Sequence, residues 1–172
     1  GQLGDGTAPS FGERPTPVPV AGGQRFTSIT AGDFHSCALV ASGAAYCWGG
    51  NTFGRLGDGT DSERTVPTAV TGGLTFAAIT AGGQHTCGIA ASGSGYCWGF
   101  NVQGQLGNGG ADSGIPAAVA GGRLFASITA GYNHTCGLTT DRLALCWGSN
   151  QYGQVGDGTT SNRSVPTAVR NP

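Results

Sequence analysis

The apolar residues of this chain fall into short runs that are rich in Ile, Val, Phe, Tyr, Trp and Thr, and Gly, Asn, Asp or Ser bounds each run. Runs of this kind are typical of β-strands. No stretch carries a helical period of useful length. We therefore predict an all-β fold. In the segment 21–70 we expect strands near residues 26–30, 36–41, 44–48 and 66–70.

The same arrangement returns at intervals of 50 and 49 residues. The segment FTSITAG at 26–32 recurs as FAAITAG at 76–82 and as FASITAG at 125–131. In each copy this segment is followed by the tripeptides His-Ser/Thr-Cys and Cys-Trp-Gly, then by an Asn and a glycine-rich motif. Each unit ends with a Pro followed by apolar residues. Self-similarity at a period near fifty residues indicates a repeat architecture.

The glycine-rich motif also opens the chain, since GQLGDGT at 1–7 matches GRLGDGT at 54–60. The chain therefore begins and ends in the same phase of the repeat, and we expect it to be a processed or partial chain. We divide this single domain into a partial blade and three full blades, at 1–20, 21–70, 71–119 and 120–170.

Four short strands in about fifty residues are typical of a β-propeller blade, which buries its faces only against neighbouring blades. Three and a half repeats make an incomplete ring, so we expect further blades or a second chain to cover the end blades. Within the blades, Ala-Ser-Gly at 41–43 and 91–93 suits a hairpin loop with a left-handed last residue. Asp141 and Arg142 replace Ser-Gly in the third unit, and we expect that loop to depart from the others.

Charge restricts the classes of partner. Charged residues make up 10% of the chain, the formal net charge is −1, and there is no Lys. A surface that neutralises many phosphates is therefore absent, so nucleic acid is a poor partner. The sequence has no run of eighteen apolar residues and no membrane span is predicted.

The order of motifs closely resembles the repeat of the regulator of chromosome condensation family. The second unit reads AG-x-x-H at 81–85, C-W-G-x-N at 97–101 and G-x-L-G-x-G at 104–109. The resemblance covers essentially the whole chain and implies a propeller, usually seven-bladed, with four antiparallel strands in each blade. Relatives include a nuclear exchange factor, GTPase regulators, secreted bacterial proteins and a bacterial inhibitor of β-lactamases, so the repeat does not specify the function. The paired Cys and the missing basic extension set the exchange-factor role aside.

Six Cys form three pairs, each ten residues apart across a predicted hairpin: Cys37 and Cys47, Cys87 and Cys97, Cys136 and Cys146. This spacing places the two Cys of a pair opposite one another on adjacent strands, so we predict three cross-strand disulfides and an oxidising compartment. There are two alternatives to disulfides. The Cys and a nearby His could bind a metal, or the Cys could be buried and reduced. The Lys-free, Arg-, Ala- and Gly-rich composition is typical of a bacterial gene of high GC content.

The residues that could do chemistry recur in every unit. A catalytic group is needed once, so we interpret the repeated His and Trp as structural, with channel-facing His that share an ion as the alternative. They are His35, His85, His134, Trp48, Trp98 and Trp147. The repeated Asp of the glycine-rich motif, replaced by Asn108 in the second unit, is interpreted as a turn cap. We predict no enzyme activity, no catalytic or metal site and no cofactor.

Positions that differ between units are the candidates for recognition. Aromatic residues flank the invariant turns, and such positions suit a binding surface, although they could also fill gaps between blades. The binding candidates are Phe34, Phe53, Phe100, Tyr132 and Tyr152. We expect an extracellular, secreted or cell-surface module that binds a protein or a glycan. The alternatives are a structural assembly protein and a secreted inhibitor of an enzyme. Sequons at Asn133 and Asn162 matter only in a eukaryotic secretory source.

Overall fold

Three four-stranded antiparallel sheets make up the fold of the computed structural model, which describes residues 1–7 and 14–170. The first blade contains β1 (Phe26–Ala31), β2 (His35–Val40), β3 (Ala45–Gly49) and β4 (Arg64–Ala69). The second contains β5 (Phe76–Ala81), β6 (His85–Ala90), β7 (Gly95–Gly99) and β8 (Ser113–Ala118). The third contains β9 (Phe125–Ala130), β10 (His134–Thr139), β11 (Ala144–Gly148) and β12 (Arg163–Ala168). The predicted all-β propeller class is confirmed.

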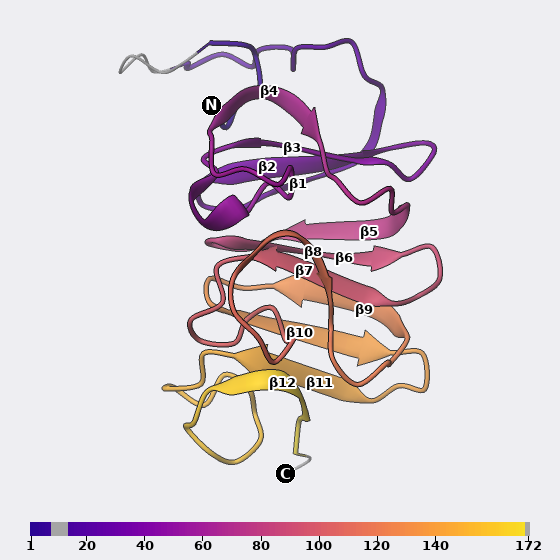
Figure 1. The fold of residues 1–172 in the computed structure, drawn as a ribbon, viewed down its shortest axis with the longest axis vertical. Coiled ribbons are helices and arrows are strands. Elements are labelled where there is room, and N and C mark those ends of the chain that lie inside the picture. Colours follow the sequence, from indigo (N-terminus) through magenta and orange to yellow (C-terminus); the bar gives the residue numbers. More distant parts are fainter. Residues whose placement is uncertain (8–13, 171–172) are drawn as a thin grey trace.

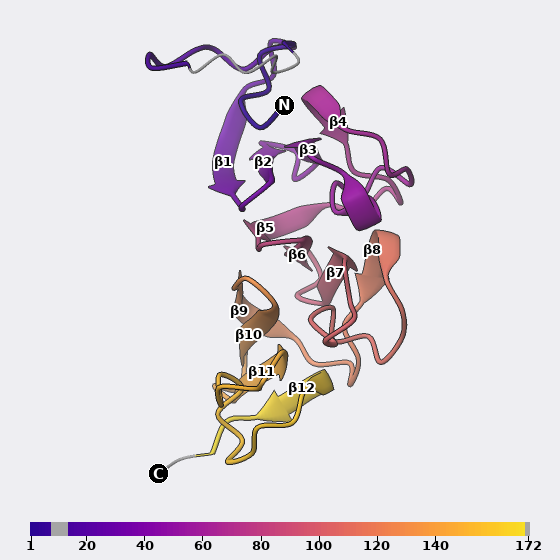
Figure 2. The same ribbon diagram turned by 90° about the vertical axis from the view of Figure 1, so that its left-hand side faces the viewer.

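The blades stack along the long axis of the molecule in chain order, with the N-terminus at one end and the C-terminus at the other (Figure 1). In the view turned by 90°, the first strand of each blade (β1, β5 and β9) lies along one side of the stack. The last strand of each blade (β4, β8 and β12) lies along the other side (Figure 2). Each blade is a meander in which neighbours in the chain are neighbours in the sheet. The three blades form an arc and not a closed ring.

The predicted strands lie where the apolar runs lie, with boundaries that differ by one or two residues. The largest shift is in the last strand of the first blade, which begins at Arg64 where the sequence predicts Val66. Gly49 pairs with Arg64 across an irregularity in the ladder, and the Arg64 side chain is held by Asp58. β8 begins at the equivalent Ser113, which pairs with Gly99 without an Asp–Arg contact, so the ladder itself sets this start.

The hydrophobic core lies between the sheets. The first blade contributes its disulfide, Leu39 and Leu56 to one core cluster. The second blade contributes Phe76 and Trp98 to the same cluster. The same pattern recurs one blade later, where the partners of the second disulfide are Ile89, Leu106, Phe125, Leu145 and Trp147. A single blade therefore buries little by itself, and each blade is stabilised by the next.

The glycine-rich motif of one blade packs on the Trp of the following blade. A Cβ at Gly57 would lie 2.6 Å from Nε1 of Trp98, and one at Gly107 would lie 2.6 Å from Nε1 of Trp147. Gly4 stands in the same relation to Trp48, at 2.7 Å. Only a residue without a Cβ fits beneath the indole ring, and all three glycines also have φ near +70°. The segment 1–6 thus covers the first blade as the motif of a preceding blade would.

The third hairpin differs from the sequence expectation. Arg142 has φ of 68°, so the expected unfavourable backbone is confirmed, but the loop keeps the shape of its siblings. Its amide donates to the carbonyl of Thr139, as Gly43 donates to Val40 and Gly93 to Ala90. The Thr139 hydroxyl also accepts from the Leu143 amide at 2.9 Å, which stabilises the turn without a glycine.

Replacing Arg142 by Gly is expected to raise the free energy of unfolding by up to about 1 kcal/mol. The left-handed region costs a non-glycine residue about 1–2 kcal/mol, part of which is offset by the greater freedom of Gly in the unfolded chain. Urea unfolding of the variant gives the value. The reciprocal variant Gly93→Arg should lose stability by a similar amount, and a gain in that variant would contradict this explanation.

Candidate binding face

One side of the stack carries the loops in which the units differ. The turn between the first two strands of each blade meets the loop that follows the third strand. The Gly50 amide donates to the carbonyl of Phe34 at 2.8 Å, and the Phe100 amide donates to that of Gln84 at 3.0 Å. We call this side the loop face, made by residues 32–34, 50–55, 83–84, 100–103, 132–133 and 149–152.

Four of the five aromatic candidates present large exposed surfaces on the loop face. Phe34, Phe53, Tyr132 and Tyr152 expose 42%, 40%, 54% and 85% of their surfaces. Phe100 is half-buried, and its ring centroid lies 4.7 Å from that of Phe53 in the preceding blade. This contact joins residues 47 positions apart in the chain, so Phe100 also fills the gap between blades.

Arg55 is a residue of the loop face that was not predicted as a binding candidate from the sequence. Its guanidinium carbon lies 5.2 Å from the centroid of the Phe34 ring, and its Nε donates to the carbonyl of Thr52 at 3.0 Å. Burial lowers the pKa of the guanidinium, and Tyr132 partly counters that effect. At the same place in the repeat the other units have Gln2, Gln105 and Gln154. The sequence signal that could have identified Arg55 is this single Arg at a position where the other units have Gln.

The backbone at Phe53 is unlike that of its counterparts. Phe53 has φ of 65° within the short 3-10 helix η1 (Thr52–Gly54), whereas Gln103 and Tyr152 have no positive φ. A left-handed conformation is unfavourable for an aromatic residue. Tyr152 shares no aromatic contact with the other candidates in the part of the chain that the structure describes. The structure therefore pairs Phe34 with Arg55 and Phe53 with Phe100, and among the described residues Tyr132 and Tyr152 lie outside both pairs.

The Asp residues of the glycine-rich motif are half of an ion pair that the sequence interpretation overlooked. Asp58 accepts from Nε of Arg64 at 2.7 Å and from the Thr60 hydroxyl at 2.8 Å. Arg163 pairs with Asp157 in the same way. In the second unit, where Asn108 replaces Asp, Ser113 replaces the Arg. The two positions change together because a buried carboxylate without its Arg would be left unpaired.

The pKa values of these carboxyls reflect this pairing. Burial raises the pKa of Asp157, but hydrogen bonds from Thr159 and Arg163 outweigh burial and leave the pKa at about 2. The pKa of Asp58 is lowered against the same opposing effect of burial, by Thr60 and Arg64. Each Asp also accepts from the amide of the Thr two residues later, as a turn cap does. The motif is thus a rigid turn.

The repeated His join one blade to the next. Nε2 of His35 lies 2.7 Å from Oγ1 of Thr86, and Nε2 of His85 lies 2.8 Å from Oγ1 of Thr135. Since the Thr86 hydroxyl donates its proton to the carbonyl of Arg55 at 2.7 Å, Nε2 of His35 is the donor to Thr86. Both rings are fully buried, so they do not line a channel.

The Cys of each blade form the three predicted disulfides, Cys37–Cys47, Cys87–Cys97 and Cys136–Cys146. This result overturns the metal-binding and free-thiol alternatives for these Cys. Sγ of Cys37 and Sγ of Cys87 each face the Thr hydroxyl of the next blade. Over residues 1–7 and 14–170, no group of three or more His, Cys, Asp or Glu is placed to hold a metal ion. Among the same residues, no helix is long and apolar enough to cross a membrane.

Solved structures share this arrangement of blades. Human WBSCR16 superposes with a TM-score of 0.78 at 22% identity, over 87% of this chain and 41% of that one. Prp20p of Saccharomyces cerevisiae has a TM-score of 0.76 at 24% identity, over 85% and 38%. At these identities the similarity shows the fold. The ectodomain of the Physcomitrella patens receptor kinase CR4 is 36% identical, with a TM-score of 0.56 over 77% and 31%.

Sequence comparison finds shorter similarities. Human alsin is 43% identical over 58 residues, which are 33% of this chain and 3% of alsin. The ultraviolet-B receptor UVR8 of Arabidopsis thaliana is 41% identical over 66 residues, which are 37% of this chain and 14% of the receptor. The chain therefore spans a small part of each of these proteins.

Family comparison covers nearly the whole chain. The regulator of chromosome condensation (RCC1) repeat matches residues 1–39, 42–89, 92–138 and 143–172, and a second form of the same repeat matches 26–55, 76–105 and 125–154. Both forms cover the Cys pairs, and the first also covers the glycine-rich motifs. The chain belongs to the RCC1 repeat family.

Proposed function

We propose that this chain is an extracellular binding module that holds a protein partner on its loop face. The observation that carries the proposal is the group of exposed aromatic side chains at positions that vary between otherwise equivalent blades. The blade core uses the repeated Phe76, Trp98 and Leu56, so the exposed rings are not required for folding. Aromatic residues on loops held by a rigid scaffold are enriched at protein interfaces.

Two further observations support the proposal. Prp20p is described with its binding to Gsp1p and histones, so a related propeller fold binds proteins. The CR4 ectodomain is an extracellular part of a receptor kinase at 36% identity, which agrees with the disulfides in every blade. The repeated His and Asp have packing partners, as with His35 bound to Thr86 and Asp58 bound to Arg64, and the proposal does not include catalysis.

The test is capture of a partner by the immobilised chain from the extracellular fraction of its source. We compare the wild type with a loop-face variant, Phe34→Ser with Phe53→Ser and Tyr132→Ser. The matched control is Leu143→Ser, which alters an exposed apolar residue in a hairpin at the opposite end of the sheet. A partner that binds the wild type and the control but not the loop-face variant supports the proposal. Equal capture by all three proteins would refute it.

A role in assembly is favoured by a separate observation on the third blade. Leu138 is 41% exposed, while its counterparts Leu39 and Ile89 are 4% exposed beneath the next blade. His134 likewise has no Thr of a following blade within the described residues. This face therefore suits another RCC1-type blade with Ser or Thr at the place of Thr86. Species above the 17.0 kDa of the chain in sedimentation, lost in Leu138→Asp, would support assembly between copies, and a monomer at every concentration would contradict it.

A further inference from the structure

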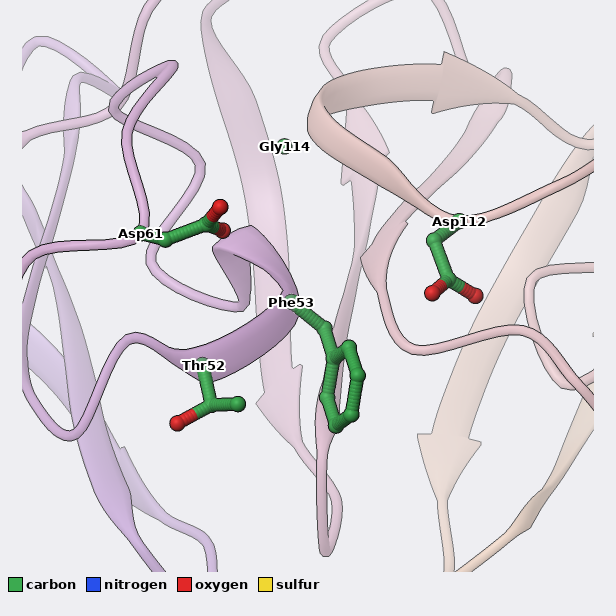
Figure 3. Close-up of a pocket in the computed structure, with 5 residues that line it drawn as sticks. All are labelled: Thr52, Phe53, Asp61, Asp112 and Gly114. Atoms are coloured by element: carbon green, nitrogen blue, oxygen red, sulfur yellow. The ribbon is translucent and has the colours of Figure 1, made fainter.

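A cavity of about 480 Å³ opens on the loop face between the first two blades. Its lining comes from η1 and the loop before β4 in the first blade, and from β8 and the residue before it in the second. The lining residues are Thr52, Phe53, Asp61, Asp112 and Gly114. In Figure 3 the Phe53 ring lies between the two aspartates, which come from different blades. We call this cavity the inter-blade pocket.

The charges on its walls are negative and uncompensated among the described residues. Asp61 makes no hydrogen bond or ion pair within that part of the chain. Asp112 uses Oδ1 to accept from the Asn101 amide at 2.6 Å, which leaves Oδ2 for another group. The nearby Arg64 is already bound to Asp58. Like charges close together on a surface favour a cation between them.

Phe53 adds an aromatic wall to this negative pocket. One side of its ring packs on Phe100, and 40% of the residue remains exposed. The face of an aromatic ring attracts a cation, and a planar guanidinium can stack on it while it donates to carboxylates. Phe and carboxylate together therefore favour a cationic ligand with a flat donor group.

The next pair of blades shows that the fold does not need these residues. Gly54 approaches Gly114 across the first junction as Gly104 approaches Ser164 across the second, so the two places are equivalent. At the second junction the counterparts are Val102, Gln103, Ala111, Asn162 and Ser164. That junction packs without an aromatic ring or a carboxylate at these positions. The pocket's chemistry is an addition to one junction of a repeated scaffold.

We propose that the inter-blade pocket binds an arginine side chain of the protein partner. Asp61 and Oδ2 of Asp112 accept from the guanidinium, and the Phe53 ring stacks against its plane. This inference rests on the proposed function, because it names the chemistry by which the loop face recognises a protein.

The experiment titrates the full ¹⁵N-labelled chain with the peptide acetyl-Gly-Arg-Gly-amide and follows amide shifts by NMR. The matched peptide acetyl-Gly-Gln-Gly-amide has no charge. We expect the Arg peptide alone to shift the amides of Phe53, Asp61 and Asp112, with a Kd that rises with salt. Equal shifts with both peptides would overturn the inference.

Variants separate charge from structure. Asp112→Asn removes the charge but keeps the amide acceptor, since Asn162 accepts from the Asn150 amide at 2.9 Å at the equivalent place. We expect Asp61→Asn and Asp112→Asn each to raise the Kd about two- to fivefold, as for exposed charge pairs. Asp141→Asn makes the same charge change on an exposed hairpin residue outside the loop face and should leave the Kd nearly unchanged. Unchanged binding in both pocket variants contradicts the assignment.

The two proposals fail separately. If the captured partner depends on Phe34 and Tyr132 but binds Asp61→Asn and Asp112→Asn fully, the loop face is confirmed as the binding surface and the pocket is not an arginine site. If the Arg peptide binds as described but no partner depends on the loop face, the pocket stands and the proposed function falls.

Discussion

Lowering the pH from 7 to 4.5 is expected to reduce the free energy of unfolding by about 5 kcal/mol through two buried histidines. Burial lowers the pKa of His35 to about 3, with Arg55 and His85 adding repulsion. Burial likewise lowers the pKa of His85 to about 3, with repulsion from His134. Nδ1 of each ring has no hydrogen-bond partner in the described residues, so a second proton there would be a buried, unpaired charge.

The direction follows from which state takes up the proton. Above pH 6.5 both His are neutral in the folded and the unfolded chain. Between pH 6.5 and about 3 the unfolded chain binds protons that the folded chain does not, so each His lowers stability by about 1.4 kcal/mol for each pH unit. The lowered carboxyl pKa values of Asp58 and Asp157 act in a lower range, because their stabilisation is present above pH 3.8 and is lost below it.

Urea unfolding followed by circular dichroism at pH 7.5, 6, 5 and 4.5 measures this dependence. His85→Gln keeps a side-chain N–H for Thr135 but cannot titrate, so its pH slope should fall by about 1.4 kcal/mol for each unit. His134→Gln is the control, since His134 is partly exposed and should change the slope less. If His85→Gln has the slope of the wild type, buried His are not the cause of acid sensitivity.

Reduction of the disulfides is expected to have a still larger effect and to proceed in two steps. Each disulfide closes a loop across a sequence separation of 10, which stabilises the fold by about 2.7 kcal/mol in the chain-entropy account. Three such losses amount to about 8 kcal/mol, comparable with the total stability of a domain of this size. The fully reduced chain should therefore be unfolded.

The order of reduction follows from burial. The disulfides of the first two blades have no exposed surface because the next blade covers them, whereas Cys136 in the third blade is partly exposed. Thiol attack requires access to the sulfur. We expect Cys136–Cys146 to be reduced first in the folded protein, and the other two pairs only when the blades separate.

Alkylation and mass spectrometry after increasing times in a phosphine reductant measure this order. A species with two labelled thiols, at Cys136 and Cys146, should accumulate before the six-thiol species. The double variant Cys136→Ala with Cys146→Ala should lack that early step. Simultaneous labelling of all six Cys in the wild type would show that the covering blades do not protect the first two pairs.

Much of the fold could be predicted from local pattern. Strand positions follow from short β-branched and aromatic runs such as 76–81, and the disulfides follow from Cys pairs ten residues apart across a hairpin. These features depend on neighbours within one unit. The two errors were also local in origin: the third hairpin kept its shape because Thr139 stabilises a left-handed Arg142, and the Asp–Arg pair of the turn was not recognised.

The candidate site could be predicted only in part. Comparison of the units identified Phe34, Phe53 and Phe100 as variable aromatic positions, because a difference between repeats is visible in one sequence. Arg55 was missed although the other units have Gln at its place, and Asp61 was missed because it has no unusual neighbour in the chain. Their significance comes from Phe34 beneath the guanidinium of Arg55 and from Asp112 across the pocket from Asp61.

The repeat, the strands, the Cys pairs and the family could all be inferred from the order of residues. Which groups meet depends on how the blades pack: His35 meets Thr86, Phe53 meets Phe100, and Asp61 and Asp112 line one cavity. Each of these pairs spans about one repeat length and joins two blades. The physical reason is that a blade buries its apolar face only against its neighbour, so the contacts between blades form when the sheets stack and are not encoded in the period of any one strand.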